Sequence, residues 1–102
     1  MQAPLLPTDH PLRRAGFRVE DRGEAVILRD PQRREVLSLN DTALALWELC
    51  DGSTSPRQML DGVCELFDVA REQAAADIER VLDEFTRAGL IDWVVAPTGD
   101  RR

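Results

Sequence analysis

The alternation of apolar and polar residues near the start of the chain predicts a small antiparallel sheet. Residues 16–21 place Phe17 and Val19 on one side and charged residues on the other, which is the period of a half-buried strand. A second apolar stretch occupies residues 24–30, and residues 34–40 alternate again. Short segments rich in turn-forming residues separate the three stretches. The pattern therefore predicts a three-stranded meander.

The segment that follows the third predicted strand combines a helix cap, an apolar face and a stop signal. Asn40 can accept hydrogen bonds from the free N–H groups of a first helical turn. Gly52 can take the left-handed conformation that often ends a helix. Between them, four residues fall on one helical face: Ala43, Leu46, Trp47 and Cys50. The polar residues of this segment therefore shape a strand-to-helix joint, and none of them is placed as a catalytic base.

The second predicted helix has a clear start. Ser55 is a favourable N-cap, Pro56 suits the first helical position, and Gln58 completes a capping box. Its predicted core face consists of Met59, Leu60, Val63, Leu66 and Phe67.

A third helix is predicted from about Ala70 to Ala88, and it begins without an orthodox cap. Gly89 ends it, and residues 90–95 form a short closing strand or extended segment. Its broad apolar arc consists of Ala74, Ile78, Val81, Leu82 and Phe85.

The order of these elements predicts an α+β domain of winged-helix-like type, with a three-stranded antiparallel sheet followed by a three-helix bundle. We expect the folded domain to span residues 13–95. Residues 1–12 are rich in proline and read as a flexible N-terminal arm, in which the lone His10 is expected to be solvated. Residues 96–102 read as a C-terminal tail.

Composition narrows the function classes. The chain has 102 residues and a formal net charge of −6, and this acidic balance argues against sequence-independent binding of nucleic acid. No apolar run approaches the roughly 20 residues of a membrane helix. The N-terminus lacks the pattern of a secretory signal, so we expect a cytoplasmic protein that binds neither nucleic acid nor membrane.

No motif for catalysis, a cofactor or a metal is found in the sequence. Cys50 and Cys64 lie in predicted helices without a CxxC pair, and buried reduced thiols explain them. The carboxylates of the third helix fit a solvated face better than an acid/base pair. Phosphate-loop, dinucleotide, nucleophile-elbow, zinc-protease and cysteine-cluster patterns do not occur. We therefore expect a binding module with no cofactor, no metal and no catalytic residue.

Three stretches together resemble the PqqD family: "EVLSLNDTALALWELCDG", "SPRQMLDGVCELFDV" and "DIERVLDEFTRAGLI". The resemblance covers about residues 12–95. The family contains peptide chaperones of the pyrroloquinoline quinone pathway, and its fold is shared by recognition elements for ribosomally made, post-translationally modified peptides (RiPPs). Quinone-pathway members have a more aromatic region around the first two strands than "RVEDRGEAVILRDP". This departure leaves another peptide-modifying pathway open.

The resemblance implies a non-catalytic peptide chaperone that binds the leader of a precursor peptide and presents it to a modifying enzyme, such as a radical SAM protein. In the family, the leader adds as a strand in the groove between the third strand and the third helix. The corresponding residues of the strand here are Arg34, Glu35, Val36, Leu37, Ser38 and Leu39. Those of the helix flank are Asp77, Val81, Glu84 and Ala88. Periodicity does not decide which flank faces the groove, and Val81 could equally be a core residue.

Three alternatives stay open at this point: a winged-helix DNA-binding domain, an enzyme acting through Cys50 or Cys64, and a general protein–protein adaptor. A DNA-reading helix should present cations to phosphates and bases. The third helix instead has three arginines against five carboxylates: Glu72, Asp77, Glu79, Asp83 and Glu84.

Overall fold

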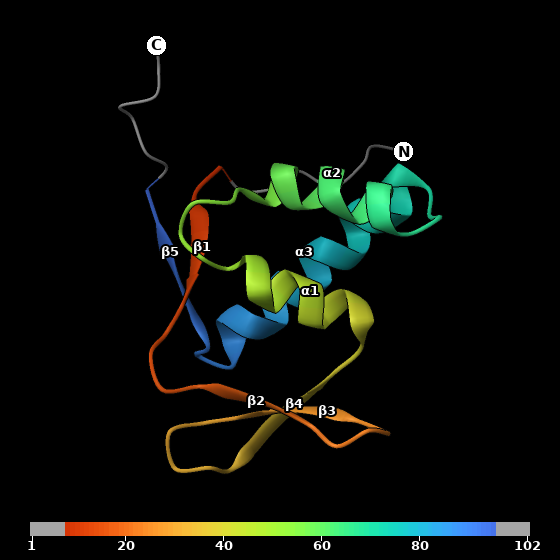
Figure 1. The fold of residues 1–102 in the computed structure, drawn as a ribbon. Coiled ribbons are helices and arrows are strands. Elements are labelled where there is room, and N and C mark those ends of the chain that lie inside the picture. The colour runs from red at the N-terminus through yellow and green to blue at the C-terminus, as the bar shows by residue number, and fades with distance from the viewer. Residues whose placement is uncertain (1–7, 96–102) are drawn as a thin grey trace.

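The computed structural model of the chain describes residues 8–95. Figure 1 shows the helices packed above one sheet, with a second, two-stranded sheet at the side. The elements, in chain order, are β1 (His10–Arg13), β2 (Arg18–Asp21), β3 (Val26–Arg29), β4 (Glu35–Leu39), α1 (Asp41–Leu49), α2 (Pro56–Leu66), α3 (Arg71–Arg87) and β5 (Ile91–Val94). The predicted α+β class is confirmed, and so is the order of three strands, three helices and a final strand that follows β1.

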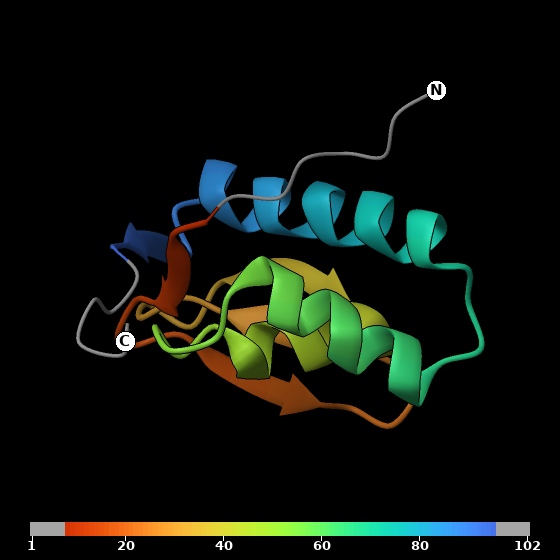
Figure 2. The ribbon, with the colours of Figure 1, turned by 90° about the horizontal axis from the view of Figure 1, so that it is seen from above.

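The larger sheet is the predicted meander. Its strands are antiparallel and lie in the order β2-β3-β4, so β2 and β4 are its edges. Viewed from above, α3 lies nearest to β4 and farthest from β2 (Figure 2). The helices therefore cover the sheet unevenly, and Val19 on β2 stays 40% exposed although the sequence pattern placed it inward.

The smaller sheet corrects the predicted N-terminal arm. Residues 10–12 belong to β1, which pairs antiparallel with β5. Two further backbone hydrogen bonds hold β1 beside the end of α1: Arg13 N–H donates to the Cys50 carbonyl, and Gly52 N–H donates to the Pro11 carbonyl, both at 2.9 Å. The remaining arm residues 1–7 and the predicted tail, residues 96–102, lie outside the described residues.

The prediction of a solvated His10 is also wrong. The side chain is buried, with 9% of the residue exposed, and its Nδ1 lies 3.1 Å from the Gly52 carbonyl oxygen. The strand pairing of β1 carries this residue against the loop after α1, so a polar partner compensates its burial.

The strand-to-helix joint follows the sequence prediction. The Ala43 N–H donates to Oδ1 of Asn40 at 2.8 Å, which caps α1 directly after β4. The capping box of α2 is complete, since Ser55 and Gln58 exchange side-chain and backbone hydrogen bonds. Helix α3 begins without a side-chain cap, as the sequence predicted. Gly52 has φ +80°, a left-handed conformation that side chains rarely adopt. It does not end α1 as predicted, because the helix ends at Leu49 with Cys50 as its C-cap.

Removal of the α1 cap is expected to destabilise the domain modestly. Asn40→Ala leaves the Ala43 N–H without its acceptor and should lower the free energy of unfolding by about 1 kcal/mol. Asn40→Ser retains an oxygen at the cap and should keep most of the stability. Urea denaturation of the three proteins checks this, and an alanine variant with an unchanged midpoint would show that the cap contributes nothing.

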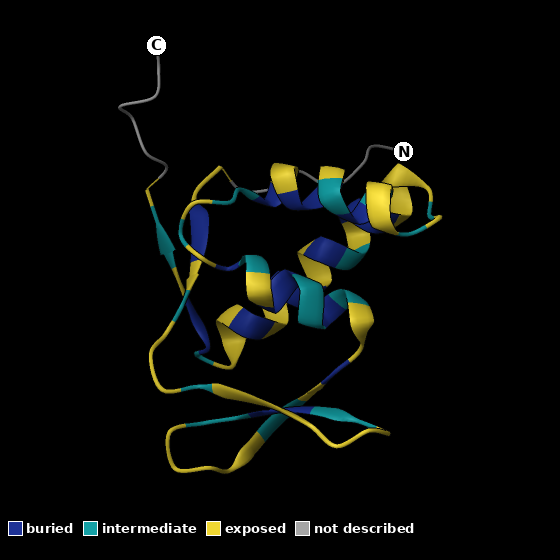
Figure 3. Cartoon of the chain, in the orientation of Figure 1, coloured by how far each residue is buried: buried dark blue, intermediate teal, exposed yellow. Residues whose placement is uncertain are grey.

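The hydrophobic core lies between the helices and the larger sheet, where Figure 3 shows the buried faces turned toward each other. Its largest fully buried side chains include Phe85, Leu28, Leu46, Met59 and Ile78. Leu66, which was predicted to be on the core face of α2, is 74% exposed. It is the last residue of α2, and its helical position lies at the margin of the face formed by the buried Met59, Leu60 and Val63.

Candidate peptide groove beside β4

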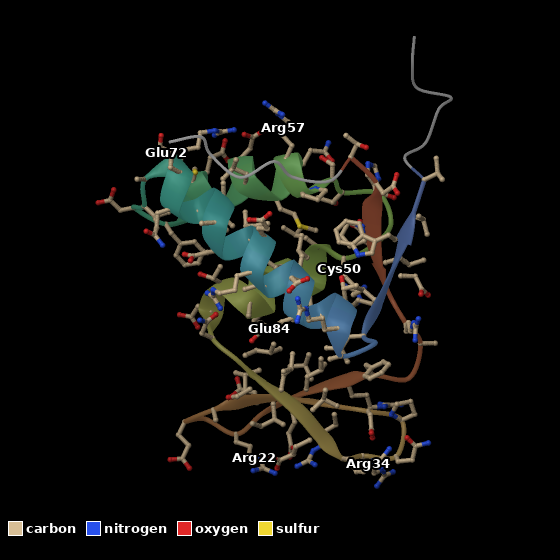
Figure 4. All side chains as sticks on the ribbon, turned by 180° about the vertical axis from the view of Figure 1, so that it is seen from behind. Arg22, Arg34, Cys50, Arg57, Glu72 and Glu84 are labelled. Atoms are coloured by element: carbon tan, nitrogen blue, oxygen red, sulfur yellow. The ribbon has the colours of Figure 1, made fainter. Side chains whose placement is uncertain are left out.

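Strand β4 has one unpaired edge. Among the described residues it pairs with β3 alone, and its other edge faces the space beside α3 (Figures 2 and 4). An edge strand presents unpaired N–H and C=O groups, which can bond to an extended peptide. This free edge is the starting point of the candidate site.

The hydrogen bonds of the turns fix which residues of β3 bond toward β4. The N–H of Asp30 donates to the Arg34 carbonyl at 2.9 Å across the β3–β4 turn. Bonding direction alternates along an antiparallel strand, so Leu28 also bonds toward β4. The β2–β3 turn agrees with this alternation, since Arg22 N–H donates to the Ala25 carbonyl at 2.8 Å.

This alternation identifies the outward-facing backbone of β4. Leu37 and Leu39 are the register partners of Leu28 and Val26, so their backbone groups face β3. Ser38 lies between them and directs its N–H and C=O to the free edge. The Ser38 side chain is exposed.

A bulge in β4 places two neighbouring apolar residues on the same face of the sheet. The register steps from Leu28↔Leu37 to Arg29↔Glu35, so Val36 is an extra residue without a partner. Both Val36 and Leu37 are half-buried and pack against the core. The alternation predicted for residues 34–40 puts Val36 and Leu37 on opposite sides of the strand, which is wrong because the bulge breaks the two-residue period.

The second element of the candidate site is the flank of α3 that lies toward the sheet. Figure 4 shows Glu84 on this side of the helix. The opposite flank faces β5, because Nε1 of Trp93 donates to Oγ1 of Thr86 at 2.9 Å. Helical spacing puts the other three residues selected from the sequence, Asp77, Val81 and Ala88, on the same flank as Glu84. Val81 is 3% exposed and belongs to the core, whereas Asp77 is half-buried and Glu84 and Ala88 are exposed.

The start of β4 is fixed by charges. Arg34 pairs with Asp30 at 3.0 Å, and Glu35 pairs with Arg22 at 3.0 Å. Burial opposes ionisation of Asp30, but the backbone and side-chain hydrogen bonds from Arg34 outweigh it and lower the pKa of this carboxyl. The side chains of Arg34 and Glu35 thus form ion pairs at the end of β4 next to the β3–β4 turn. The backbone around Ser38 is the part of the strand that we take as the docking site.

Two residues of α3 that were not selected from the sequence contact the side chain of Asp77. Gln73 Nε2 donates to Oδ1 of Asp77 at 3.3 Å, and the Arg80 guanidinium lies 3.7 Å from the same oxygen. Their spacing of four and three residues from Asp77 is the signal that could have identified them.

The arginines of α3 do not form a cationic surface for nucleic acid. Each is paired with a carboxylate, and the pairs are Arg71–Asp61, Arg80–Asp77 and Arg87–Asp83. Within residues 8–95, no three His, Cys, Asp or Glu side chains gather as metal ligands. None of the helices in this part of the chain has the length and apolar character needed to cross a bilayer.

The two cysteines differ in exposure, which corrects the expectation that both are buried. Cys50 is fully buried, and burial raises the pKa of its thiol to about 12. Cys64 is only half-buried. The thiolate is the reactive form, so at pH 8 Cys50 should remain a protonated, inert thiol.

We expect native-state thiol titration at pH 8 to modify Cys64 first and Cys50 only after unfolding. Cys64→Ser isolates Cys50, and Cys50→Ala isolates Cys64. Rapid modification of Cys50 in the folded Cys64→Ser variant would contradict its burial. It would also support the alternative that the chain is an enzyme acting through a cysteine.

Comparison with known proteins agrees with this geometry. The family model described as Coenzyme PQQ synthesis protein D (PqqD) matches residues 24–91, which is more than half of the chain. The chain belongs to the PqqD family. The matched segment runs from the start of β3 through α3 to the start of β5, so it contains β4 and α3, the two elements of the candidate site. PqqD-family and related recognition domains are typically non-catalytic and bind peptides.

Two solved structures share the fold of this PqqD-family chain. One is described as lasso peptide synthetase B1 complexed with the leader peptide; it has a TM-score of 0.66 and 25% identity, and covers 81% of this chain and 98% of its own. The other is described as TbiB1 in complex with the TbiA(beta) leader peptide; it has a TM-score of 0.65 and 17% identity, with coverage of 79% and 94%. A search of curated protein sequences finds no match.

Proposed function

We propose that this PqqD-family chain is a non-catalytic chaperone that binds the leader of a ribosomal precursor peptide and presents it to a modifying enzyme. The observation that carries the proposal is the free edge of β4, where Ser38 directs its backbone groups outward beside α3. Two structures with the same fold are described as complexes with leader peptides, which supports this choice of ligand.

The mode of binding follows from the edge. The leader adds to β4 as another strand, and backbone hydrogen bonds supply affinity with little demand on sequence. Its side chains on the helical side contact the half-buried Val36 and Leu37. On the α3 flank, the half-buried Asp77 and the exposed Glu84 and Ala88 border the same side chains and provide selectivity.

The modifying enzyme is proposed to be a separate protein, such as a radical SAM enzyme, and the pathway to be pyrroloquinoline quinone synthesis or another RiPP pathway. A gene for a short peptide beside the gene for this chain would identify the leader.

Selection from a displayed library of random 16-residue peptides tests the proposal without knowledge of the natural leader. We expect the folded chain to enrich peptides that bind in titration and that mass spectrometry recovers chemically unchanged. Failure to enrich any peptide, or covalent change of a peptide by the chain alone, would overturn the proposal.

A further inference from the structure

We propose that the leader carries an arginine or lysine that pairs with Glu84, so that this residue sets the charge preference of the groove. This inference rests on the proposed function, because it requires a peptide on β4. It concerns the chemistry of the ligand, which neither the fold nor the family defines.

The two carboxylates on the flank of α3 toward β4, Asp77 and Glu84, differ in whether they have partners. Asp77 already has two partners, the Arg80 guanidinium at 3.7 Å and the Gln73 amide at 3.3 Å. Glu84 lies on the same flank and is exposed, and it makes no ion pair or side-chain hydrogen bond within residues 8–95. Glu84 is therefore the carboxylate of this flank that is available to a ligand.

Strand β4 offers no free cation that could pair with Glu84 in place of the peptide. Arg34, at the start of the strand, pairs with Asp30 at 3.0 Å in the hairpin end. Ser38, next to the open edge, is neutral and exposed. A strand that docks between β4 and α3 thus meets the unpaired carboxylate of Glu84, and a basic side chain on that strand is complementary to it.

The alternation of side chains along the added strand determines where the basic residue lies in the leader. Side chains of an added strand alternate between the two faces of the sheet. The face toward α3 also contains Val36 and Leu37, against which apolar side chains of the peptide would pack. The basic residue should therefore be two or four positions from the apolar anchors, and it should not neighbour them directly. Arginine should be favoured over lysine, since its planar fork matches a carboxylate.

The chain offers a matched control on the same helix. Glu79 is exposed and, like Glu84, makes no ion pair within the described residues. Five residues separate the two, which turns Glu79 to the opposite flank of α3. Glu79→Lys therefore makes the same change of net charge as Glu84→Lys at a place remote from the groove.

The experiment repeats the library selection with wild type, Glu84→Lys and Glu79→Lys, followed by titration of the selected peptides. Wild type and Glu79→Lys should enrich peptides with a basic residue in the stated alternation, and Glu84→Lys should enrich acidic residues there. For one wild-type peptide, Glu84→Gln should weaken binding about fivefold. Glu84→Lys should weaken it at least about tenfold, and salt should reduce the difference.

The outcomes separate the two proposals. Peptides that require the β4 edge but show no basic preference, or that bind Glu84→Lys and Glu79→Lys equally, would overturn the role of Glu84 and leave the proposed function standing. Absence of any peptide that requires the β4 edge would overturn both. Circular dichroism of each variant confirms that it is folded.

Discussion

Replacing Trp47 by alanine is expected to destabilise the domain by about 3–5 kcal/mol. The residue is 4% exposed and stands edge-on to two aromatic rings, with centroid distances of 5.5 Å to Phe85 and 6.4 Å to Phe17. It thereby connects α1 to α3 and to the segment that leads into β2. A cavity at this point removes contacts from three parts of the structure at once. Such a loss is a large share of the 5–15 kcal/mol that a typical domain has.

Urea denaturation of Trp47→Ala and Leu66→Ala provides the measurement and its control. Leu66 is 74% exposed, so its truncation should change the free energy of unfolding by less than about 0.5 kcal/mol. If the Trp47 variant unfolds at the same midpoint as the Leu66 variant, the placement of α1 against the core is wrong.

Blocking the outward amide of β4 is expected to weaken peptide binding at least about tenfold, which corresponds to ~1.4 kcal/mol. Ser38→Pro removes the N–H that faces the free edge, while the bonds of Leu37 and Leu39 to β3 remain. This position tests the ladder better than Val36, because Val36 lies at the bulge. A proline at Val36 would change the geometry of the bulge as well as the hydrogen bonding to the peptide, so a loss of affinity would have two causes.

Val19→Pro on β2 is the matched control for Ser38→Pro. Val19 pairs with Leu28, which bonds toward β4, so the amide of Val19 faces the free edge on the other side of the sheet. Both variants lose one outward N–H from an edge strand, and both need a denaturation curve to show that they are folded. Equal affinity of the two folded variants for a selected peptide would refute docking on β4.

Much of the fold could be predicted from local sequence signals. The two-residue period indicated β2 and β4, and a short apolar run indicated β3. The helices were located by caps and apolar arcs whose partners lie within a few residues. The capping atoms of Asn40 and Ser55 are where the sequence placed them. Such signals are reliable because the interaction and the pattern that reveals it belong to the same short segment.

The features that were missed depend on contacts between distant segments. His10 and Val94 are register partners from opposite ends of the described chain, and proline-rich residues near His10 gave no strand pattern. The bulge at Val36 follows from pairing with β3, which the period of β4 alone does not reveal. Burial of His10 is a consequence of the same β1–β5 pairing.

The candidate site could be predicted to the level of its elements. The sequence and the family resemblance selected β4 and one flank of α3. Helical periodicity alone does not determine which flank of that helix faces β4. The hydrogen bond from Trp93 to Thr86 depends on the tertiary fold, and it identifies the flank turned away from the groove. The burial of Val81 is likewise tertiary, because a helix face becomes core only when another element covers it.

Amide chemical-shift mapping with a library-selected peptide tests the central claim most directly. The account predicts that the largest changes fall on β4 around Ser38 and on the α3 flank that contains Asp77 and Glu84. Changes centred on α2, with β4 and α3 unaffected, would contradict it.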